Sequence, residues 1–244
     1  AVVSDARYKQ IKPDLAFAIH IEPGRPFGYV STRPGLINCA SLGLKITLNG
    51  KTAHAADPSD GISPSLAVAE FIQKISEFNH GDELNNNFRL TTVTHVQIGE
   101  QSFGISPGDA SIFVTLRTSN DDSLSQLDKD VRGLVSNIST KFKLTFDFEI
   151  FDHFAASIND KEAHDIAVNA MKALNINYGS IGVPMRASED FGIFGKQSKA
   201  AMLCLGPGED YAALHNPDYD FNDDLIPIGT GIFERITRDL LGTY

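Results

Sequence analysis

Two strand patterns occur in this sequence, and their order along the chain restricts the fold more than any other feature. Residues 15–21 and 200–205 are apolar at almost every position, as strands are when both faces of a parallel sheet are covered. Between them, residues 42–48 and 144–150 alternate apolar and polar side chains, which is typical of antiparallel strands with one solvated face. We therefore expect an α/β domain that an antiparallel domain interrupts.

The interrupting segment has the pattern of two helices among four strands. A helix is expected with Ser63 as its N-cap and Pro64 at its first position, because these residue types favour those places. The residues expected on its buried face are Val68, Phe71, Ile72 and Ile75. Strand patterns at 88–99 and 110–118, and a helical pattern at about 123–142, precede the alternating strand that ends at residue 150. The order β-α-β-β-α-β predicts a ferredoxin-like α+β domain over residues 41–151.

The segments on either side, residues 1–40 and 152–244, are expected to form one α/β domain. Residues 1–10 have the pattern of the end of a helix, and helical patterns recur at about 161–174 and 227–241. These helices alternate with the apolar strands, which is the order expected when helices cover a largely parallel sheet.

Charge and cysteine content exclude several classes of partner. The 244 residues carry a formal net charge of -10, and the basic residues form no cluster, so neither nucleic acid nor an anionic membrane is expected as a partner. No apolar run approaches the ~20 residues that cross a bilayer. The two cysteines, Cys39 and Cys204, stand in apolar contexts and offer no disulfide framework, which favours the cytoplasm as the location.

Two histidines stand near the ends of the apolar strands. His20 lies at the end of the first strand, and His215 follows the second within Leu-His-Asn-Pro, just before a run of carboxylates. Open α/β sheets bind ligands beyond the carboxyl ends of their strands, and neutral imidazole is the commonest side-chain metal ligand. Taken alone, His20 is better explained as a core histidine, and His215 as a turn histidine on an acidic loop.

A Ser-Glu-Asp-Phe motif at residues 188–191, followed a strand later by Leu-His-Asn-Pro, resembles the zinc-peptidase family that includes aminoacylases, hippurate hydrolase and the indole-acetyl-amino-acid amidohydrolases. The resemblance implies that His20 and His215 are metal ligands, one to each of two divalent ions. Zinc is the expected metal, with manganese, nickel or cobalt as alternatives. The resemblance further implies that Glu189 and Asp190 are active-site carboxylates. We assign Glu189 to catalysis and Asp190 to substrate binding.

Two further residues match the family within the interrupting domain. His54 lies in Gly-Lys-Thr-Ala-His-Ala-Ala-Asp-Pro, which is similar to a lid motif whose histidine acts on the tetrahedral intermediate, often in the partner subunit. Arg117 lies in Thr-Leu-Arg-Thr and matches an arginine that binds the substrate carboxylate. A loop histidine and a solvated arginine at a strand end remain the plainer explanations.

The resemblance implies a metal-dependent amidohydrolase that cleaves an N-acyl amino acid or a related small amide. Residues 1–40 and 152–244 would form its catalytic domain, and residues 41–151 a lid that also forms a homodimer. The family's first metal-binding motif and its Glu-Glu pair have no match here. We expect them upstream of Ala1, so that the chain corresponds to the C-terminal two-thirds of a member.

The sequence also departs from the family at two places and leaves other functions open. Gly104 stands where a polar substrate contact is expected, and Arg186 replaces a small residue before Ser-Glu-Asp-Phe. The main alternative is a catalytically incompetent fragment that serves as a dimerisation or binding module. A nucleotide-binding domain built on Gly-Pro-Gly at 206–208 is weaker, because no Gly-rich loop opens a helix and no phosphate-binding lysine accompanies it.

Overall fold

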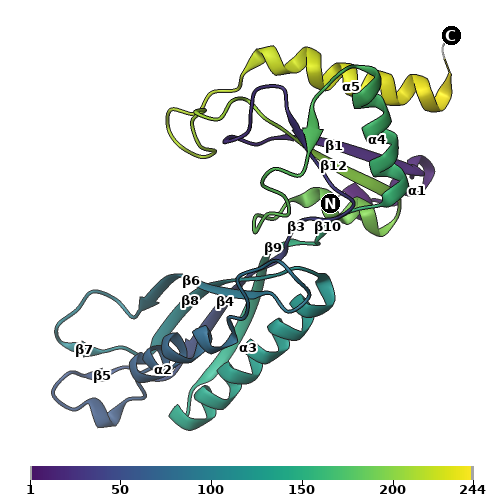
Figure 1. The fold of residues 1–244 in the computed structure, drawn as a ribbon. Coiled ribbons are helices and arrows are strands. Elements are labelled where there is room, and N and C mark those ends of the chain that lie inside the picture. Colours follow the sequence, from purple (N-terminus) through teal and green to yellow (C-terminus); the bar gives the residue numbers. More distant parts are fainter. Residues whose placement is uncertain (1, 243–244) are drawn as a thin grey trace. The chain divides into compact units, whose positions relative to one another are not determined.

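The computed structural model describes residues 2–242, which form two compact units (Figure 1). The first unit contains the described residues up to Cys39 and those from Ala155 onwards, and the second unit is Ala40–Phe154. The sequence had suggested boundaries after residues 40 and 151. Among residues 2–242, no helix is long and apolar enough to cross a membrane.

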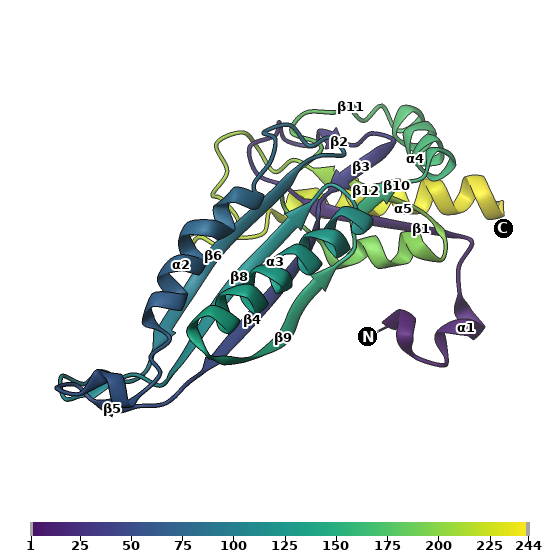
Figure 2. The same cartoon turned by 90° about the horizontal axis from the view of Figure 1, so that it is seen from below.

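The second unit has the β-α-β-β-α-β order that its patterns predicted. Its four long strands pair antiparallel in the order β6-β8-β4-β9, and both helices lie on the same face of this sheet (Figures 1 and 2). The elements are β4 (Ala40–Asn49), α2 (Ser65–Ile75), β6 (Arg89–Ile98), β8 (Asp109–Thr118), α3 (Asp121–Phe142) and β9 (Thr145–Phe154). This connectivity and strand order are those of a ferredoxin-like sheet.

Three details of this unit differ from the sequence prediction. Helix α2 begins at Ser65, so Pro64 occupies the cap position, while Ser63 Oγ accepts a hydrogen bond from the Ser65 amide at 3.3 Å. Ile72 is 43 % exposed, because it lies about 100° round the helix from the buried Phe71. Ile150 is 54 % exposed, because β9 is an edge strand and its second half is largely uncovered.

A second, smaller sheet extends one end of this unit. It pairs β5 (Ala53–His54) with β7 (Ile105–Ser106), and His54 lies opposite Ile105 (Figure 1). The sequence did not predict these strands, because a strand of two residues has no measurable period.

The first unit is built on a mixed four-stranded sheet in the order β1-β12-β2-β11. Its strands are β1 (Leu15–Ile21), β2 (Val30–Ser31), β11 (Tyr178–Gly179) and β12 (Lys199–Leu205). β1 runs parallel to β12, as their apolar patterns predicted, whereas β2 runs antiparallel to β12, so the sheet is mixed. β12 is central and buried after its first residue, but β1 is an edge strand within residues 2–242 and each of its residues is only half-buried.

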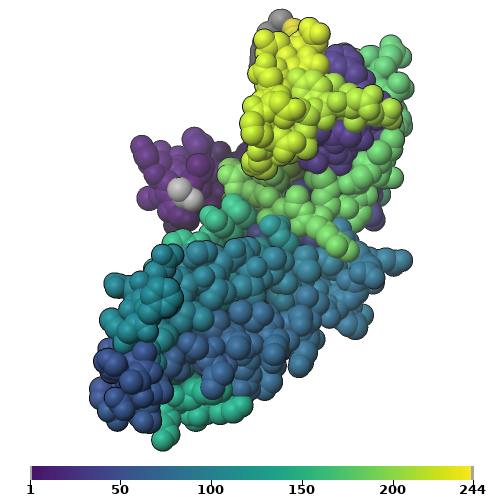
Figure 3. Space-filling model, turned by 90° about the vertical axis from the view of Figure 1, so that its left-hand side faces the viewer, coloured from purple at the N-terminus to yellow at the C-terminus, as the bar shows by residue number. Residues whose placement is uncertain are grey.

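Two helices pack on one face of this sheet and enclose the larger core. They are α4 (Lys161–Ala173), capped by the Asp160 carboxylate, and α5 (Ile226–Leu241), which lies at the surface of the unit in yellow (Figure 3). The core consists of Val30, Ala167, Val168, Ala170, Met171, Leu203, Leu205, Leu225, Ile232 and Ile236. The helix expected over residues 1–10 is instead a 3-10 turn (Val2–Ser4) and one short helix, α1 (Tyr8–Ile11), while Ala1 lies outside the described residues.

A two-stranded sheet, β3 (Gly35–Asn38) with β10 (Ser157–Asn159), adjoins the four-stranded one. The buried Asn159 side chain donates toward the carbonyls of Arg33 and Met202 and toward Thr32 Oγ1, and accepts from the Met202 amide at 2.7 Å. One amide side chain thus fastens β10 to β12 and to the residues after β2.

Candidate functional site

Two of the predicted site residues meet at the carboxyl end of β1. His20 is the penultimate residue of that strand, and Glu189 directly precedes the 3-10 helix η4 (Asp190–Lys196). The His20 Nε2 atom lies 3.4 Å from Glu189 Oε1, and the two side chains are 31 % and 32 % exposed. The fold therefore brings an imidazole and a carboxylate together from distant parts of the sequence, in a place that solvent can reach.

The other nitrogen of the His20 ring faces a carboxylate that the sequence analysis missed. Nδ1 is buried and has no hydrogen-bond partner in the described part of the chain, where Glu22 Oε2 lies 3.6 Å away. Glu22 stands two residues after His20, and side chains two apart on an extended chain point to the same side. That spacing was the available signal. A carboxylate behind a histidine orients the ring and leaves Nε2 for other partners.

The neighbouring strand, β12, has a cysteine directly beside His20, but the thiol of this cysteine is not available as a metal ligand. Cys204 is the register partner of His20 and is fully buried. Burial raises the pKa of the Cys204 thiol from its ordinary 9.0 to about 12, because the low-dielectric interior disfavours the thiolate. Since metal ions bind the thiolate, the site depends on nitrogen and oxygen donors.

His20 Nε2 and the Glu189 carboxylate suit a divalent cation in their donor chemistry. The orphaned Nδ1 atom behind them is consistent with a ring held for a partner at Nε2. Nowhere among residues 2–242, however, do three or more His, Cys, Asp or Glu side chains gather into a possible metal site. These two residues fit a metal as part of its ligand set and do not complete a coordination sphere.

Among residues 2–242, neither His215 nor Asp190 forms a side-chain hydrogen bond or ion pair with His20 or Glu189. His215 is exposed in the loop between β12 and α5 and has a φ of 66°, a left-handed conformation that is uncommon outside glycine and worth a functional hypothesis. Asp190 is exposed at the start of η4. That His215 meets His20 at a metal, and that Asp190 contacts substrate, stay predictions.

The second unit contains the remaining two predicted residues. His54 is exposed on β5, and its Nδ1 accepts a hydrogen bond from the Ala56 amide at 3.1 Å. A neutral ring must then carry its proton on Nε2, so His54 presents an N–H donor to solvent. Arg117 is half-buried on β8, between the buried Leu116 and Thr118, and alternation along the strand places it on the helix-free face.

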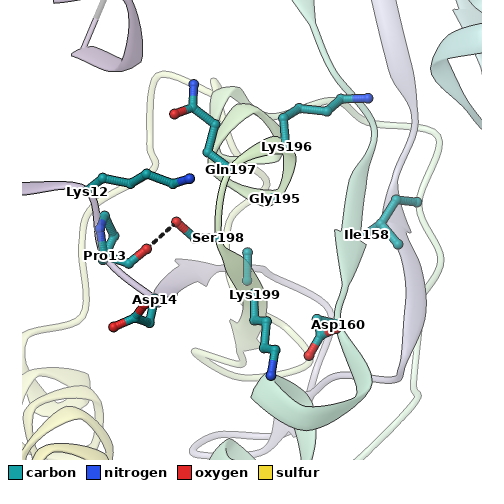
Figure 4. Close-up of a pocket in the computed structure, with 11 residues that line it drawn as sticks. Lys12, Pro13, Asp14, Ile158, Asp160, Gly195, Lys196, Gln197, Ser198 and Lys199 are labelled. Atoms are coloured by element: carbon teal, nitrogen blue, oxygen red, sulfur yellow. Dashed lines mark hydrogen bonds between the residues drawn. The ribbon is translucent and has the colours of Figure 1, made fainter. Parts of the chain in front are cut away.

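A hollow of about 650 Å³ lies at the opposite end of β1 and β12, between the start of these strands and η4. Its lining includes Lys12, Asp14, Asp160, Lys196 and Lys199, whose side chains point in different directions (Figure 4). The hydrogen bond drawn there, from Ser198 Oγ to the Pro13 carbonyl at 2.6 Å, joins the segments that precede β12 and β1. The hollow contains none of the predicted site residues.

Comparison with known proteins gives these residues a family. Residues 1–239 match the model of peptidase family M20/M25/M40. The N-acetyldiaminopimelate deacetylase of Exiguobacterium sibiricum is 24 % identical over 238 residues, which cover 98 % of this chain and 64 % of that protein. The IAA-amino acid hydrolase ILR1-like 4 of Arabidopsis thaliana is 28 % identical over 245 residues, with coverage of 92 % and 53 %.

Solved structures show the same fold. The YXEP protein of Bacillus subtilis, described as a dinuclear metal binding peptidase of the M20 family, superposes with a TM-score of 0.74 at 18 % identity, over 95 % of this chain and 58 % of that one. The chain thus spans between about half and two-thirds of the length of the relatives it matches. By the match over nearly all of its residues, the chain belongs to peptidase family M20/M25/M40.

Proposed function

We propose that this chain is part of a metal-dependent amidohydrolase that cleaves the amide bond of an N-acyl amino acid or a related small amide. The observation that carries the proposal is the approach of His20 Nε2 to Glu189 Oε1 at the carboxyl end of β1. The names of the relatives support the substrate class, because one is an N-acetyldiaminopimelate deacetylase and another an IAA-amino acid hydrolase.

In this proposal each residue has a separate task. A divalent cation at His20 would polarise the amide carbonyl and make a water molecule more acidic. Glu189 would accept a hydrogen bond from that water, since its carboxylate lies beside the His20 ring, and the general base would come from the part of the relatives' length that this chain does not span. The His54 Nε2–H donates to the oxygen on which negative charge develops. Arg117 binds the substrate carboxylate with its planar fork, and Asp190 contacts the substrate.

The complete site requires more ligands than residues 2–242 bring together. We propose that it holds two divalent ions, zinc in the first place, with His215 as a further ligand. The remaining ligands would come from the part of the relatives' length that this chain does not span. The second unit would act as a lid and pair with a second copy, in whose active site His54 would work. Arg186, just before the Ser-Glu-Asp-Phe motif, would add a positive charge to the substrate pocket.

One observation keeps a second function open. Because no three potential ligands gather among residues 2–242, the second candidate is a binding module in which the second unit mediates association. The two functions differ in metal content, which can be measured.

Metal titration of the natural full-length protein tests the proposal. We expect zinc to bind, and His20→Ala to weaken binding by more than the roughly 10- to 100-fold that loss of an outer-shell partner costs. Glu189→Gln keeps the shape of the side chain but should abolish turnover. His80→Ala, an exposed histidine of the second unit, is the matched control and should bind zinc as the wild type does. Equal zinc affinity in the His20 variant would refute the proposed site.

A further inference from the structure

Arg25 is a buried arginine close to the proposed site that none of its predicted residues explains. Its side chain and backbone together are 5 % exposed. Nε donates to Ser31 Oγ at 2.9 Å and to the Ile181 carbonyl at 3.2 Å, and Nη2 donates to the Gly182 carbonyl at 3.2 Å and toward Met185 Sδ at 3.3 Å. Every nitrogen of the guanidinium is engaged, because Nη1 also contacts the segment after β1.

The contacts of Nη1 connect Arg25 to His20. Nη1 lies 3.4 Å from the Pro23 carbonyl and 3.5 Å from Glu22 Oε1. The second oxygen of the same carboxylate, Oε2, is the atom 3.6 Å from His20 Nδ1. Glu22 therefore stands between the guanidinium and the imidazole, with one oxygen toward each.

The contacts of Nε and Nη2 connect Arg25 to the segment that leads to Glu189. The Ile181 and Gly182 carbonyls and Met185 all belong to the stretch just before the Ser-Glu-Asp-Phe motif. Gly182 has a φ of +68°, and a Cβ atom there would lie 2.8 Å from Arg25 Nη2. Only glycine lets this stretch approach the guanidinium so closely.

The backbone of Arg25 reaches the third segment of the site. Arg25 forms an isolated antiparallel bridge with Gly208, whose amide donates to the Arg25 carbonyl at 3.1 Å. A Cβ atom on Gly206 would lie 2.8 Å from Arg25 Cβ and 2.3 Å from the Pro26 carbonyl oxygen. The loop that leaves β12 toward His215 is thus packed directly on Arg25.

We propose that Arg25 is the positioning residue of the site, holding in one arrangement the three segments that carry or adjoin His20, Glu189 and His215. It acts on His20 through Glu22 and on Glu189 through the carbonyls of residues 181 and 182. That the arrangement serves metal binding rests on the proposed function, but the contacts of Arg25 do not depend on it. A neutral residue would fill the same space without desolvating a charge, and burying a guanidinium is costly unless its geometry is used.

The test combines two measurements on the natural full-length protein. Hydrogen exchange of the metal-free protein reports whether residues 22–31, 181–189 and 206–208 are held together, and Co²⁺ titration, followed by visible absorption, reports the ligand geometry at His20. We expect Arg25→Met to speed exchange at least tenfold in all three segments and to leave the second unit, Ala40–Phe154, unchanged. Co²⁺ affinity should fall by roughly 10- to 100-fold, with an altered absorption spectrum.

Two further variants separate the routes through which Arg25 acts. Arg25→Lys keeps the charge but loses the planar fork, so both effects should be intermediate, and this variant decides the question if Arg25→Met does not fold. Glu22→Gln should weaken Co²⁺ binding about tenfold without changing exchange at residues 181–189. Arg235→Met, an exposed arginine of α5 paired with Asp239, is the control and should change neither measurement.

The results separate this inference from the proposed function. If wild-type protein binds no Co²⁺, the metal proposal fails, and hydrogen exchange alone judges Arg25. Faster exchange confined to residues 22–31, or unchanged exchange in all three segments, would overturn the positioning role even if Co²⁺ binds normally to the wild type.

Discussion

At the scale of single residues, protonation separates groups that can act from groups that cannot. The His54 ring accepts a hydrogen bond at Nδ1 from the Ala56 amide, which leaves the Nε2–H as a donor whatever the metal does. Cys204 lies beside His20 in the sheet, yet burial raises the pKa of its thiol to about 12. His54 can therefore donate a hydrogen bond from Nε2, whereas the Cys204 thiol stays protonated at neutral pH.

The first prediction concerns His54. Removing a single donor to a developing oxyanion typically costs about 3 kcal/mol, which is a roughly 100- to 1,000-fold loss of kcat. His54→Ala in the full-length protein should therefore lower kcat on an N-acetyl amino acid by that factor and leave KM and zinc content nearly unchanged. His80→Ala serves as control. An equal loss of zinc would show that His54 is a ligand instead.

The second prediction follows from the Cys204 pKa. Because the folded-state pKa of about 12 lies above the ordinary 9.0, the unfolded chain loses this proton first as pH rises. The stabilisation is complete below pH 9 and is lost progressively from pH 9 toward 12. Between pH 8 and 10.5, the free energy of unfolding of the wild type, measured with denaturant, should fall by about 2 kcal/mol more than that of Cys204→Ala. Parallel pH curves for the two proteins would contradict the assignment.

At the scale of elements, long periodic segments were predictable from sequence and short ones were not. Residues 15–21 form a strand as expected, and the alternation of residues 42–48 marks β4. The pattern could not reveal that β1 lies at an edge of the described sheet, because periodicity reports which faces a strand buries and not how many neighbours it has. β2, β5 and β11, of two residues each, are held by their partners and have no signal of their own.

The candidate site was predictable to a similar degree. Motif resemblance identified His20 and Glu189, which the fold brings together. Glu22 could have been found from its spacing, because it stands two residues after His20. Arg25 stands in a loop, where no period constrains the residue type, and its role depends on contacts with residues more than 150 positions away. Such contacts are invisible until the chain is folded.

The third prediction concerns Asn159, which joins β10 to β12. Its loss takes away the acceptor of the Met202 amide and a donor to the Arg33 carbonyl, whereas the Thr32 hydroxyl keeps its bond to the Met202 carbonyl. Each buried group left unsatisfied costs about 1–3 kcal/mol. Asn159→Ala should lower the free energy of unfolding by about 3 kcal/mol in urea titrations. Asn169→Ala, at an exposed position of α4, should change it by less than about 0.5 kcal/mol.

The fourth prediction concerns the edge strands of the second unit, β6 and β9. An uncovered edge exposes backbone groups, and a two-fold axis can pair them with a second copy. We expect a dimer in sedimentation at micromolar concentration. Val96→Asp on β6 and Ile150→Asp on β9 are a matched pair, and one of them should dissociate the dimer while the other leaves it intact. A wild type that sediments only as a monomer would refute the prediction.

At the scale of the whole molecule, the chain belongs to a family of hydrolases but spans only 64 % or less of the relatives described above. What residues 2–242 bring together is one imidazole and one carboxylate, with a second carboxylate behind the ring. Two divalent cations held close together repel strongly and need an anionic bridge between them, which these residues do not assemble.

The fifth prediction is therefore that residues 1–244 alone do not hydrolyse amides at an enzymatic rate. Loss of a general base alone costs roughly 100- to 10,000-fold, and loss of the metal pair costs more. The assay compares this chain with the full-length protein on N-acetyl- and N-benzoyl-amino acids with added Zn²⁺ or Mn²⁺. Chelator-sensitive turnover by the 244 residues on their own would disprove it.

The pairing of β1 with β12 also has a consequence for the order of events on the ribosome. The second unit makes its strand pairs within Ala40–Phe154, so it can fold as soon as it emerges. β1 is translated first, but Leu15 pairs with Lys199, and at about 5–20 residues per second that partner arrives roughly 10 to 40 s later. For that interval an almost wholly apolar strand lacks this partner, and the nascent chain depends on chaperones or on rapid synthesis to keep the exposed strand from aggregating.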